Sequence, residues 1–234
     1  MIATLALGVL LAAGDAGYTV ARTASGEQPL LAADERAWSA ASAVEWGPAT
    51  YSTRFRALWS DTGLFLRYDA TDPEPWSTMT RRDEHLWEEE VVEIFLDPDG
   101  DGRDYYELEI SPANVVCDLR VITPPPDMKQ DFPFDLAGLQ TRAVVNKDAA
   151  GKKTGWTATA LLPWAGLKAL PTAAKVDVPP KPGERWHFNV FRIERPGGKA
   201  APEKDGVFAA WSPTGAGTFH KPGAFRDLLF AGAR

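Results

Sequence analysis

The segment 91–111 constrains the fold more than any other part of the chain, because it predicts two β-strands joined by a tight turn. In 91–97 and in 105–111, apolar side chains occupy every second position, which is the period of a strand with two different faces. The sequence PDGDGRD between them is rich in residues that tolerate positive φ and reverse the chain. The faces opposite the aliphatic stripes carry Glu93, Glu107 and Glu109. The surroundings of these three carboxylates therefore decide the function.

Strand-like stretches recur along the whole chain, separated by turn residues. They are Tyr18–Thr23, Thr50–Trp59, Leu64–Ala70, Val91–Asp97, Tyr105–Ser111, Val115–Ile122, Thr141–Asn146, Gly155–Leu162, Arg185–Glu194 and Asp227–Phe230. Long helical periodicity and internal repeats are absent, and only two short helices are expected, at Asp34–Ala40 and Leu161–Leu170. Many short strands with irregular loops predict an all-β protein, an antiparallel β-sandwich with one or two short helices.

The composition fits one large domain and narrows the class of partner. With 234 residues, 44% of them hydrophobic, and with 9 Trp and 11 Phe, the chain can bury one continuous core. We assign residues 18–234 to a single domain. The formal net charge of −7 argues against nucleic acid and against an anionic membrane surface. Neutral sugars, cations and other proteins remain as partners. Cys117 is the single cysteine, which excludes an internal disulfide.

The first 17 residues have features of an export signal. An apolar run, Ile2–Ala13, is followed by the small residues Gly14 and Ala16. This run is long enough for the core of a signal peptide and too short to span a bilayer. No Lys or Arg precedes Arg22, so the positive start of a typical signal is missing. We expect an exported protein, periplasmic or secreted, without membrane insertion. The alternative is a first strand or helix that packs on the domain.

The turn of the predicted hairpin carries a candidate metal site. Asp97, Asp99 and Asp101 recur at every second residue, and hard oxygen ligands of this kind suit Ca²⁺. The twelve-residue calcium loop is not completed, because Leu108 stands where a Glu is needed. Acidic residues also favour turns for conformational reasons alone. Ca²⁺ is therefore a candidate cofactor with a competing structural explanation.

Sequence motifs for catalysis are absent. No GxSxG, Walker or dinucleotide-binding fingerprint occurs. His85, His187 and His220 do not have the spacing of a zinc site. Pairs of carboxylates exist, but nothing in the sequence selects one pair as the two catalytic groups of a glycosidase. We expect a protein that is not an enzyme.

Five motifs, in order along the chain, resemble one known family. LWEEEVVEIFLDPDGDGRDYYELEISP, which contains the hairpin, is similar to the signature of the family 9 carbohydrate-binding modules and their single-domain relatives. The other four are WSDTGLFLRYDATDPEPW at 59–76, GWTATALLPWAGL at 155–167, PGERWHFNVFRIER at 182–195 and WSPTGAGTFHKPGAFRDLLF at 211–230. The resemblance covers roughly residues 30–232. It implies a jelly-roll-like sandwich that binds an oligo- or polysaccharide of the gluco or xylo type.

The resemblance also implies which residues bind the sugar. In the binding members two aromatic rings enclose the terminal sugar, and these rings correspond to Trp87 and Phe219 here. Glu93 corresponds to a carboxylate that accepts hydrogen bonds from sugar hydroxyls. Arg192 could face the same site or pair with a glutamate across the sheet. Modules of this family imply glycoside hydrolases as partners and structural Ca²⁺ elsewhere in the domain.

The chain departs from the sugar-binding members at three places. Glu109 stands where they carry an arginine, and the small residues Gly215, Ala216 and Gly217 stand where they carry a polar amide. Phe219 replaces a tryptophan, which keeps an aromatic face but reduces its area. The groups that pair with sugar hydroxyls are therefore only partly matched.

Two other functions stay open on the sequence. The same sandwich shape hosts b-type haem in some exported electron-transfer proteins, which would require axial ligands such as Met79 or Met128 with His85 or Lys129. A structural domain of the cell envelope that binds no ligand is the third hypothesis, in which Trp87 is simply packed.

Overall fold

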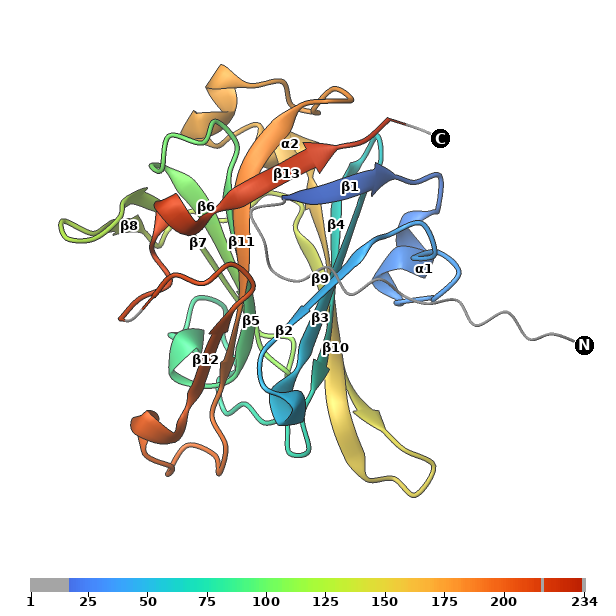
Figure 1. Ribbon diagram of the computed structural model, residues 1–234, viewed down its shortest axis with the longest axis vertical. Helices are drawn as coiled ribbons and strands as arrows, with labels where there is room; N and C mark the ends of the chain where they lie inside the picture. Colours follow the sequence, from blue (N-terminus) through green and yellow to red (C-terminus); the bar gives the residue numbers. More distant parts are fainter. Residues whose placement is uncertain (1–16, 216, 233–234) are drawn as a thin grey trace, which may run out of the picture.

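β-Strands form almost all of the regular structure in the computed structural model, which describes residues 17–215 and 217–232. Two layers of strands lie face to face (Figure 1). The expected export signal, 1–17, lies outside the described residues except for Gly17, and so does Ala216. None of the helices among the described residues is long and apolar enough to cross a membrane.

The first layer, called here the front sheet, contains the hairpin. Its strands in spatial order are β8 (Lys129–Asp131), β7 (Val116–Thr123), β6 (Tyr105–Ile110), β5 (Val91–Asp97), β11 (Arg185–Glu194) and β13 (Arg226–Phe230), with β12 (Val207–Ala210) also paired to β11. The second layer is the back sheet. It consists of β3 (Thr53–Trp59), β4 (Gly63–Thr71), β10 (Lys153–Pro163) and β9 (Gln140–Lys147), with β2 (Ala43–Trp46) paired to β3.

β1 (Tyr18–Arg22) joins the two layers. It pairs with β13 of the front sheet and with β3 of the back sheet, and both pairings are parallel. The other strand pairs among the described residues are antiparallel. The predicted all-β sandwich is confirmed. The prediction that all strands are antiparallel is wrong for β1. This strand bridges the two layers by pairing with their edge strands β13 and β3, and both of these run in the same direction as β1.

The core fills the space between the layers. Aliphatic positions of the hairpin, Val92, Ile94 and Leu96 on β5, point into it and are almost completely buried. Aromatic residues from both sheets meet them there, and pairs such as Phe55 with Tyr68 have ring centroids 5.1 Å apart. Aromatic packing of this kind contributes strongly to stability because each ring buries a large area.

The predicted hairpin has the register that the alternation requires. β5 pairs antiparallel with β6, with Glu93 opposite Glu109 and Ile94 opposite Leu108. The ten predicted strands all occur, with shifts of a few residues at their ends. Three short strands were not predicted, β2, β8 and β12, because segments of three or four residues show too little alternation to detect.

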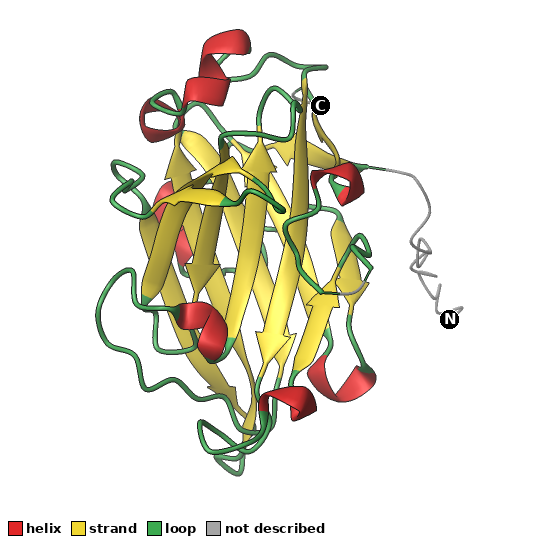
Figure 2. Ribbon diagram, turned by 90° about the vertical axis from the view of Figure 1, so that its left-hand side faces the viewer, coloured by secondary structure: helices red, strands yellow, loops and turns green. Residues whose placement is uncertain are grey.

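Helical structure is sparse, and the short helical pieces lie between strands without forming a layer of their own (Figure 2). α2 (Trp164–Leu167) falls inside the predicted helix 161–170. The predicted helix at 34–40 is wrong, because α1 (Glu27–Leu31) precedes it and 34–40 forms turns. The positive φ at Ala33 interrupts helical geometry after α1. Trp38, which lies in the turns, packs with Leu30 against the outer face of the back sheet.

Gly155 supplies a test of the packing in the back sheet. It lies at a register irregularity of β10 with a φ of +153°, and a Cβ there would sit 2.0 Å from the Ala70 carbonyl oxygen. We expect Gly155→Ala to lower the free energy of unfolding by roughly 2–4 kcal/mol, since backbone on β4 has to move. Gly223→Ala, where nothing lies within 4 Å of the added atom, should change it by less than about 0.5 kcal/mol. Urea unfolding of both variants measures this, and equal stability would contradict the close approach.

Candidate functional site

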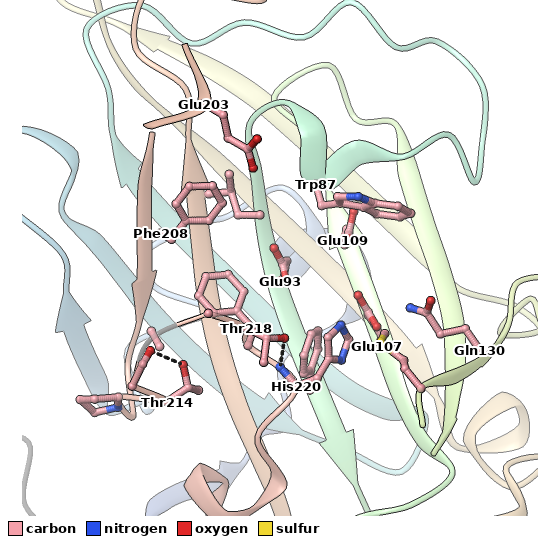
Figure 3. A pocket seen from close by; sticks show the side chains of 18 residues that line it. Trp87, Glu93, Glu107, Glu109, Gln130, Glu203, Phe208, Thr214, Thr218 and His220 are labelled. Atoms are coloured by element: carbon pink, nitrogen blue, oxygen red, sulfur yellow. Dashed lines mark hydrogen bonds between the residues drawn. The ribbon is translucent and has the colours of Figure 1, made fainter. Parts of the chain in front are cut away.

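The outer face of the front sheet carries a cavity of about 850 Å³. Its floor is made by β5 and β6, and its walls come from β12, the segment after it and the region around β8. Figure 3 shows the glutamates on the floor with Trp87 and Phe208 above them. The cavity size is typical of a site for a small organic ligand. The outer face of the hairpin is therefore a pocket and not an open surface.

Trp87 stands at the entry to β5, in a short 3₁₀ turn, Leu86–Glu88. Leu86 is fully buried and fixes the turn against the sheet, while Trp87 is only half buried. The Trp87 ring stacks on His85, with centroids 4.4 Å apart and planes inclined by 21°, and also lines the pocket. The turn thus offers one large aromatic ring to the cavity from a fixed position.

Phe219 reaches the pocket from the segment that follows β12. Asn189 on β11 holds the start of this segment through two hydrogen bonds, donating to the Ser212 carbonyl (2.8 Å) and accepting from the Ser212 N–H (3.1 Å). The Phe219 ring stacks on Phe191 of β11 at 4.4 Å and 19°. Phe208 on β12 lies beside it, 6.4 Å away between centroids, and is 51% exposed. Two further aromatic rings therefore line the same cavity as Trp87.

The floor of the pocket contains three glutamates that lie close together. Glu93 on β5 is 2% exposed, and Glu107 and Glu109 on β6 are 3% and 1% exposed. One carboxylate oxygen from each lies within 4.8 Å of the other two. Each glutamate also has one buried oxygen, Oε1 of Glu93 and Oε2 of the other two, without a hydrogen-bond partner. Buried carboxylates without partners are costly, so this cluster requires an explanation.

Burial and mutual repulsion keep these carboxyl groups from ionising easily. Burial raises the pKa of Glu107 to about 8. Burial, followed by the charges of the neighbouring glutamates, raises the pKa values of Glu93 and Glu109 well above the usual range. The lining residues include no Lys or Arg. Burial also lowers the pKa of His220 to about 4, which leaves this ring neutral at pH 7 beside the Tyr105 hydroxyl, 2.8 Å away.

The comparison with family models identifies the family. The model described as carbohydrate family 9 binding domain-like matches residues 32–193, more than half of the chain. The chain belongs to this family. The matched segment contains Trp87 and the hairpin with its three glutamates, whereas Phe208, Phe219 and His220 follow it.

Solved structures of similar fold agree with this assignment. A candidate carbohydrate-binding protein from Bacteroides uniformis has a TM-score of 0.69 at 16% identity, covering 92% of this chain and 100% of its own. A family 9 carbohydrate-binding module from Caldicellulosiruptor kristjanssonii in complex with cellotriose has a TM-score of 0.61 at 15% identity, covering 93% and 94%. The module from that organism in complex with glucose gives 0.56 at 15%, covering 84% and 87%. No curated protein matches the chain in sequence.

The pocket of this family 9 domain brings together four of the five residues that the sequence suggested for sugar binding. Trp87, Glu93, Glu109 and Phe219 all line it. Arg192 does not, because it pairs with Val92 in the register of β11 with β5, and Val92 points into the core. The prediction that Arg192 could face the site or pair with Glu107 or Glu109 is therefore wrong.

Arg192 instead forms a buried ion cluster between the two sheets. Its side chain is completely buried, and its guanidinium donates hydrogen bonds to Asp72 (3.2 Å) and to Glu194. It also lies over the Trp156 ring, 5.2 Å from the centroid. Burial raises the pKa of the adjacent Glu90 to about 10, so that carboxyl stays protonated at pH 7. The inner cluster thus contains its own cation, which the pocket does not.

The three aspartates of the hairpin turn do come together, with one oxygen from each within 4.8 Å of the others. Lys175 lies beside two of them, its Nζ 2.5 Å from Asp99 and 2.7 Å from Asp101. Asp97 accepts the backbone N–H groups of Gly100 and Gly102. Calcium binding at this turn stays a prediction, and an ion there would have to displace the lysine ammonium group.

Several lining residues were not named as sugar-binding residues from the sequence. Glu107 was placed on the same face of the hairpin as Glu109, but the resemblance gave it no role. Phe208, His220 and Gln130 gave no signal, because they lie on short edge strands or in a loop whose path depends on tertiary contacts.

The residues proposed as haem ligands do not gather in the pocket. Of these, only Met128 lines the pocket, while His85 stacks on Trp87. No axial pair is formed in this cavity by the described residues.

The raised pKa values predict how the stability of the ligand-free protein depends on pH. Glu107, with its pKa at about 8, and Asp97, raised mainly by burial to about 7, hold protons in the folded state that the unfolded chain loses above its ordinary pKa near 4.5 or 3.8. Stability therefore falls as pH rises through this interval. Between pH 6.5 and 8, where the opposing contribution of His220 is small because its unfolded pKa is about 6.5, we expect the melting temperature to fall by roughly 4–8 °C.

Glu107→Gln should reduce this slope, because the amide cannot titrate. Glu45→Gln, on the exposed strand β2, is the matched control and should keep it. Differential scanning fluorimetry across the interval measures both variants, and a melting temperature that rises with pH would contradict the assignment of raised pKa values.

The ion pairs of Lys175 with Asp99 and Asp101 lead to a prediction of how calcium changes the stability of the protein. In wild type its ammonium group neutralises Asp99 and Asp101, so added Ca²⁺ should raise the melting temperature little. Lys175→Gln removes that charge and leaves three carboxylates for a cation, so millimolar CaCl₂ should stabilise the variant by a few °C more than wild type. Equal shifts in both proteins, measured against EDTA, would argue against a cation site at this turn.

Proposed function

We propose that this family 9 domain binds an oligo- or polysaccharide in the pocket of the front sheet, without catalysis. The observation that supports this most directly is the joint lining of one cavity by the half-buried rings of Trp87 and Phe219 and by the carboxyl group of Glu93. Flat aromatic faces cover the C–H side of a pyranose, while carboxyl groups form hydrogen bonds with its hydroxyls. The pocket supplies both kinds of group around one space.

The remaining lining residues fit the same ligand class. Gln130, Thr214 and Thr218 add side chains that can both donate and accept hydrogen bonds at the margin of the pocket. Phe208 extends the aromatic wall beside Phe219. The relatives in complex with cellotriose and glucose support a gluco-configured sugar, and a xylo-type chain is the other candidate.

The arrangement of the carboxyl groups favours binding over hydrolysis. Glycosidases place two carboxyl groups on either side of the bond that breaks. Here Glu93, Glu107 and Glu109 lie together on one floor, with one oxygen from each within 4.8 Å of the other two, an arrangement on one side of the cavity that does not favour two of them flanking a ligand. We therefore propose a non-catalytic domain that serves glycoside hydrolases acting on the same polymer. Export, inferred from the apolar run Ile2–Ala13, would place it where polymers are found.

Removing the Trp87 ring tests the proposed contact. Trp87→Ala should weaken binding by about 1–3 kcal/mol, which is a loss of roughly 5- to 150-fold in affinity, because the ring supplies one wall of the pocket. Val144→Ala, on β9 of the back sheet and 38% exposed in wild type, is the control and should bind normally. Titration calorimetry with cello- and xylo-oligosaccharides measures both. Unchanged affinity in Trp87→Ala, or no binding of any saccharide at millimolar concentration, would refute the proposal.

A further inference from the structure

We propose that the pocket selects a sugar that carries a protonated amine, an amino sugar of the gluco type, and holds its ammonium group among Glu93, Glu107 and Glu109. This inference rests on the proposed carbohydrate binding and adds the chemical class of the sugar. It follows from the charge of the pocket, from the spacing of the three carboxylates and from the aromatic walls above them.

The first argument is charge. Among the described residues the lining includes four glutamates, the three on the floor and Glu203 at the margin, and no Lys or Arg. His220 is neutral at pH 7, because burial lowers its pKa. Three carboxyl groups that are at least 97% buried stay protonated unless a cation favours their ionised form. A neutral sugar brings hydroxyl groups but no charge, so it does not favour that ionised form.

The second argument is geometry. An ammonium group donates three hydrogen bonds in tetrahedral directions. With N···O distances of about 2.8 Å, its three acceptors lie about 4.6 Å apart. One carboxyl oxygen from each floor glutamate lies within 4.8 Å of the other two, which fits such a group. Each of the three glutamates also has one buried oxygen without a hydrogen-bond partner, so the described residues leave an acceptor free on all three.

The third argument separates an amine on a sugar from a bare metal ion. A metal ion would occupy only the floor and leave most of the 850 Å³ cavity unused. Trp87, Phe208 and Phe219 line the space above the floor. Aromatic faces attract ammonium groups and cover the C–H side of sugar rings, and they have no part in binding a hydrated metal ion. The complete lining therefore fits an amino sugar better than a cation alone.

If an ammonium group binds among the three glutamates, its binding should release protons from them. In the empty pocket the pKa of Glu107 is about 8, so the floor holds protons below that pH. An ammonium group favours the ionised carboxylates and displaces those protons into solution. The other titratable groups around the floor are Tyr105 on β6, Cys117 on β7, Asp97 at the end of β5, His220 after β12 and Glu203. On the same face of β11, Ile193 lines the pocket, Phe191 pairs with Glu93 and packs under Phe219, and Asn189 is bonded to Ser212; none of these three side chains titrates.

Three disaccharides with one backbone test the proposal. Cellobiose, its di-N-acetylated 2-amino analogue and the fully deacetylated analogue differ only at carbon 2, which bears a hydroxyl, an acetamide or an amine. At about pH 6 the amine is protonated, since amines of this kind titrate near the α-amino range of roughly 7.7–8.0. Titration calorimetry on the full chain should show the deacetylated sugar binding at least about tenfold more tightly than cellobiose. Its binding should also release protons, seen as different apparent enthalpies in two buffers.

Charge-neutral variants locate the selectivity. Glu107→Gln and Glu109→Gln keep the shape of the side chain and should each reduce the preference for the amine to within about threefold. Two independent positions keep the test valid if one variant folds poorly, which circular dichroism would show. Glu45→Gln on β2, which removes the same charge from an exposed site, should keep the preference of wild type.

The other possible results distinguish the selectivity for an amine from the proposed carbohydrate binding. Equal or tighter binding of cellobiose would refute the selectivity for an amine and leave the proposed carbohydrate binding intact. Failure of all three sugars to bind would refute both. Calcium alone, titrated without sugar, would replace the amine hypothesis by a metal site if it bound in a Glu107-dependent way while the amine gave no advantage.

Discussion

The register between β5 and β6 is the constraint on which both the core and the pocket depend. Because side chains alternate along a strand, this one pairing sends Val92, Ile94 and Leu96 into the core and the three glutamates to the other face. A slip by one residue would place carboxylates among the aromatic rings of the core, which is strongly unfavourable. Tyr68 of the back sheet adds a direct tie across the layers, donating a hydrogen bond to the Glu93 carbonyl at 2.9 Å.

Buried charge occurs on both faces of the front sheet, but only the inner face balances it. Between the sheets, Arg192 pairs with Asp72 and Glu194, and Glu90 stays protonated. On the outer face, the glutamates of the pocket have no described cationic partner. The inner cluster holds its own cation, Arg192, and lies in the core, although Glu90 Oε1 and Arg192 Nη1 have no hydrogen-bond partner there. The outer cluster has no cation among the described residues and faces a cavity, and this difference is why only the outer face suggests recognition.

The sequence predicted the hairpin and most strands because, in a long alternating segment, the alternation itself shows which side chains lie on the same face. Trp87, Glu93 and Glu109 could be placed near one another for the same reason, since they belong to one hairpin and its entry. Arg192 could not be placed, because β11 is buried on both faces and a charged residue was not expected on the face that Trp186, Phe188 and Val190 turn to the core. The orientation of the Arg192 side chain depends on the pairing of β11 with β5, and this pairing is a long-range contact that the local sequence does not specify. The turns at 34–40 were mistaken for a helix because propensity alone does not see the packing of Trp38.

The floor and the walls of the pocket have different origins in the chain. The floor and Trp87 belong to the segment that matches the family, whereas Phe208, Phe219 and His220 follow it on β12 and the next loop. That loop is held to β11 by Asn189 through Ser212, so its rings keep their place over the carboxylates without being part of the hairpin. Loops vary more freely than the strands that support them. Changes in the walls can therefore alter the size and shape of the ligand that the pocket accepts. The charge that we propose for this ligand depends instead on three glutamates, which are fixed by the pairing of β5 with β6.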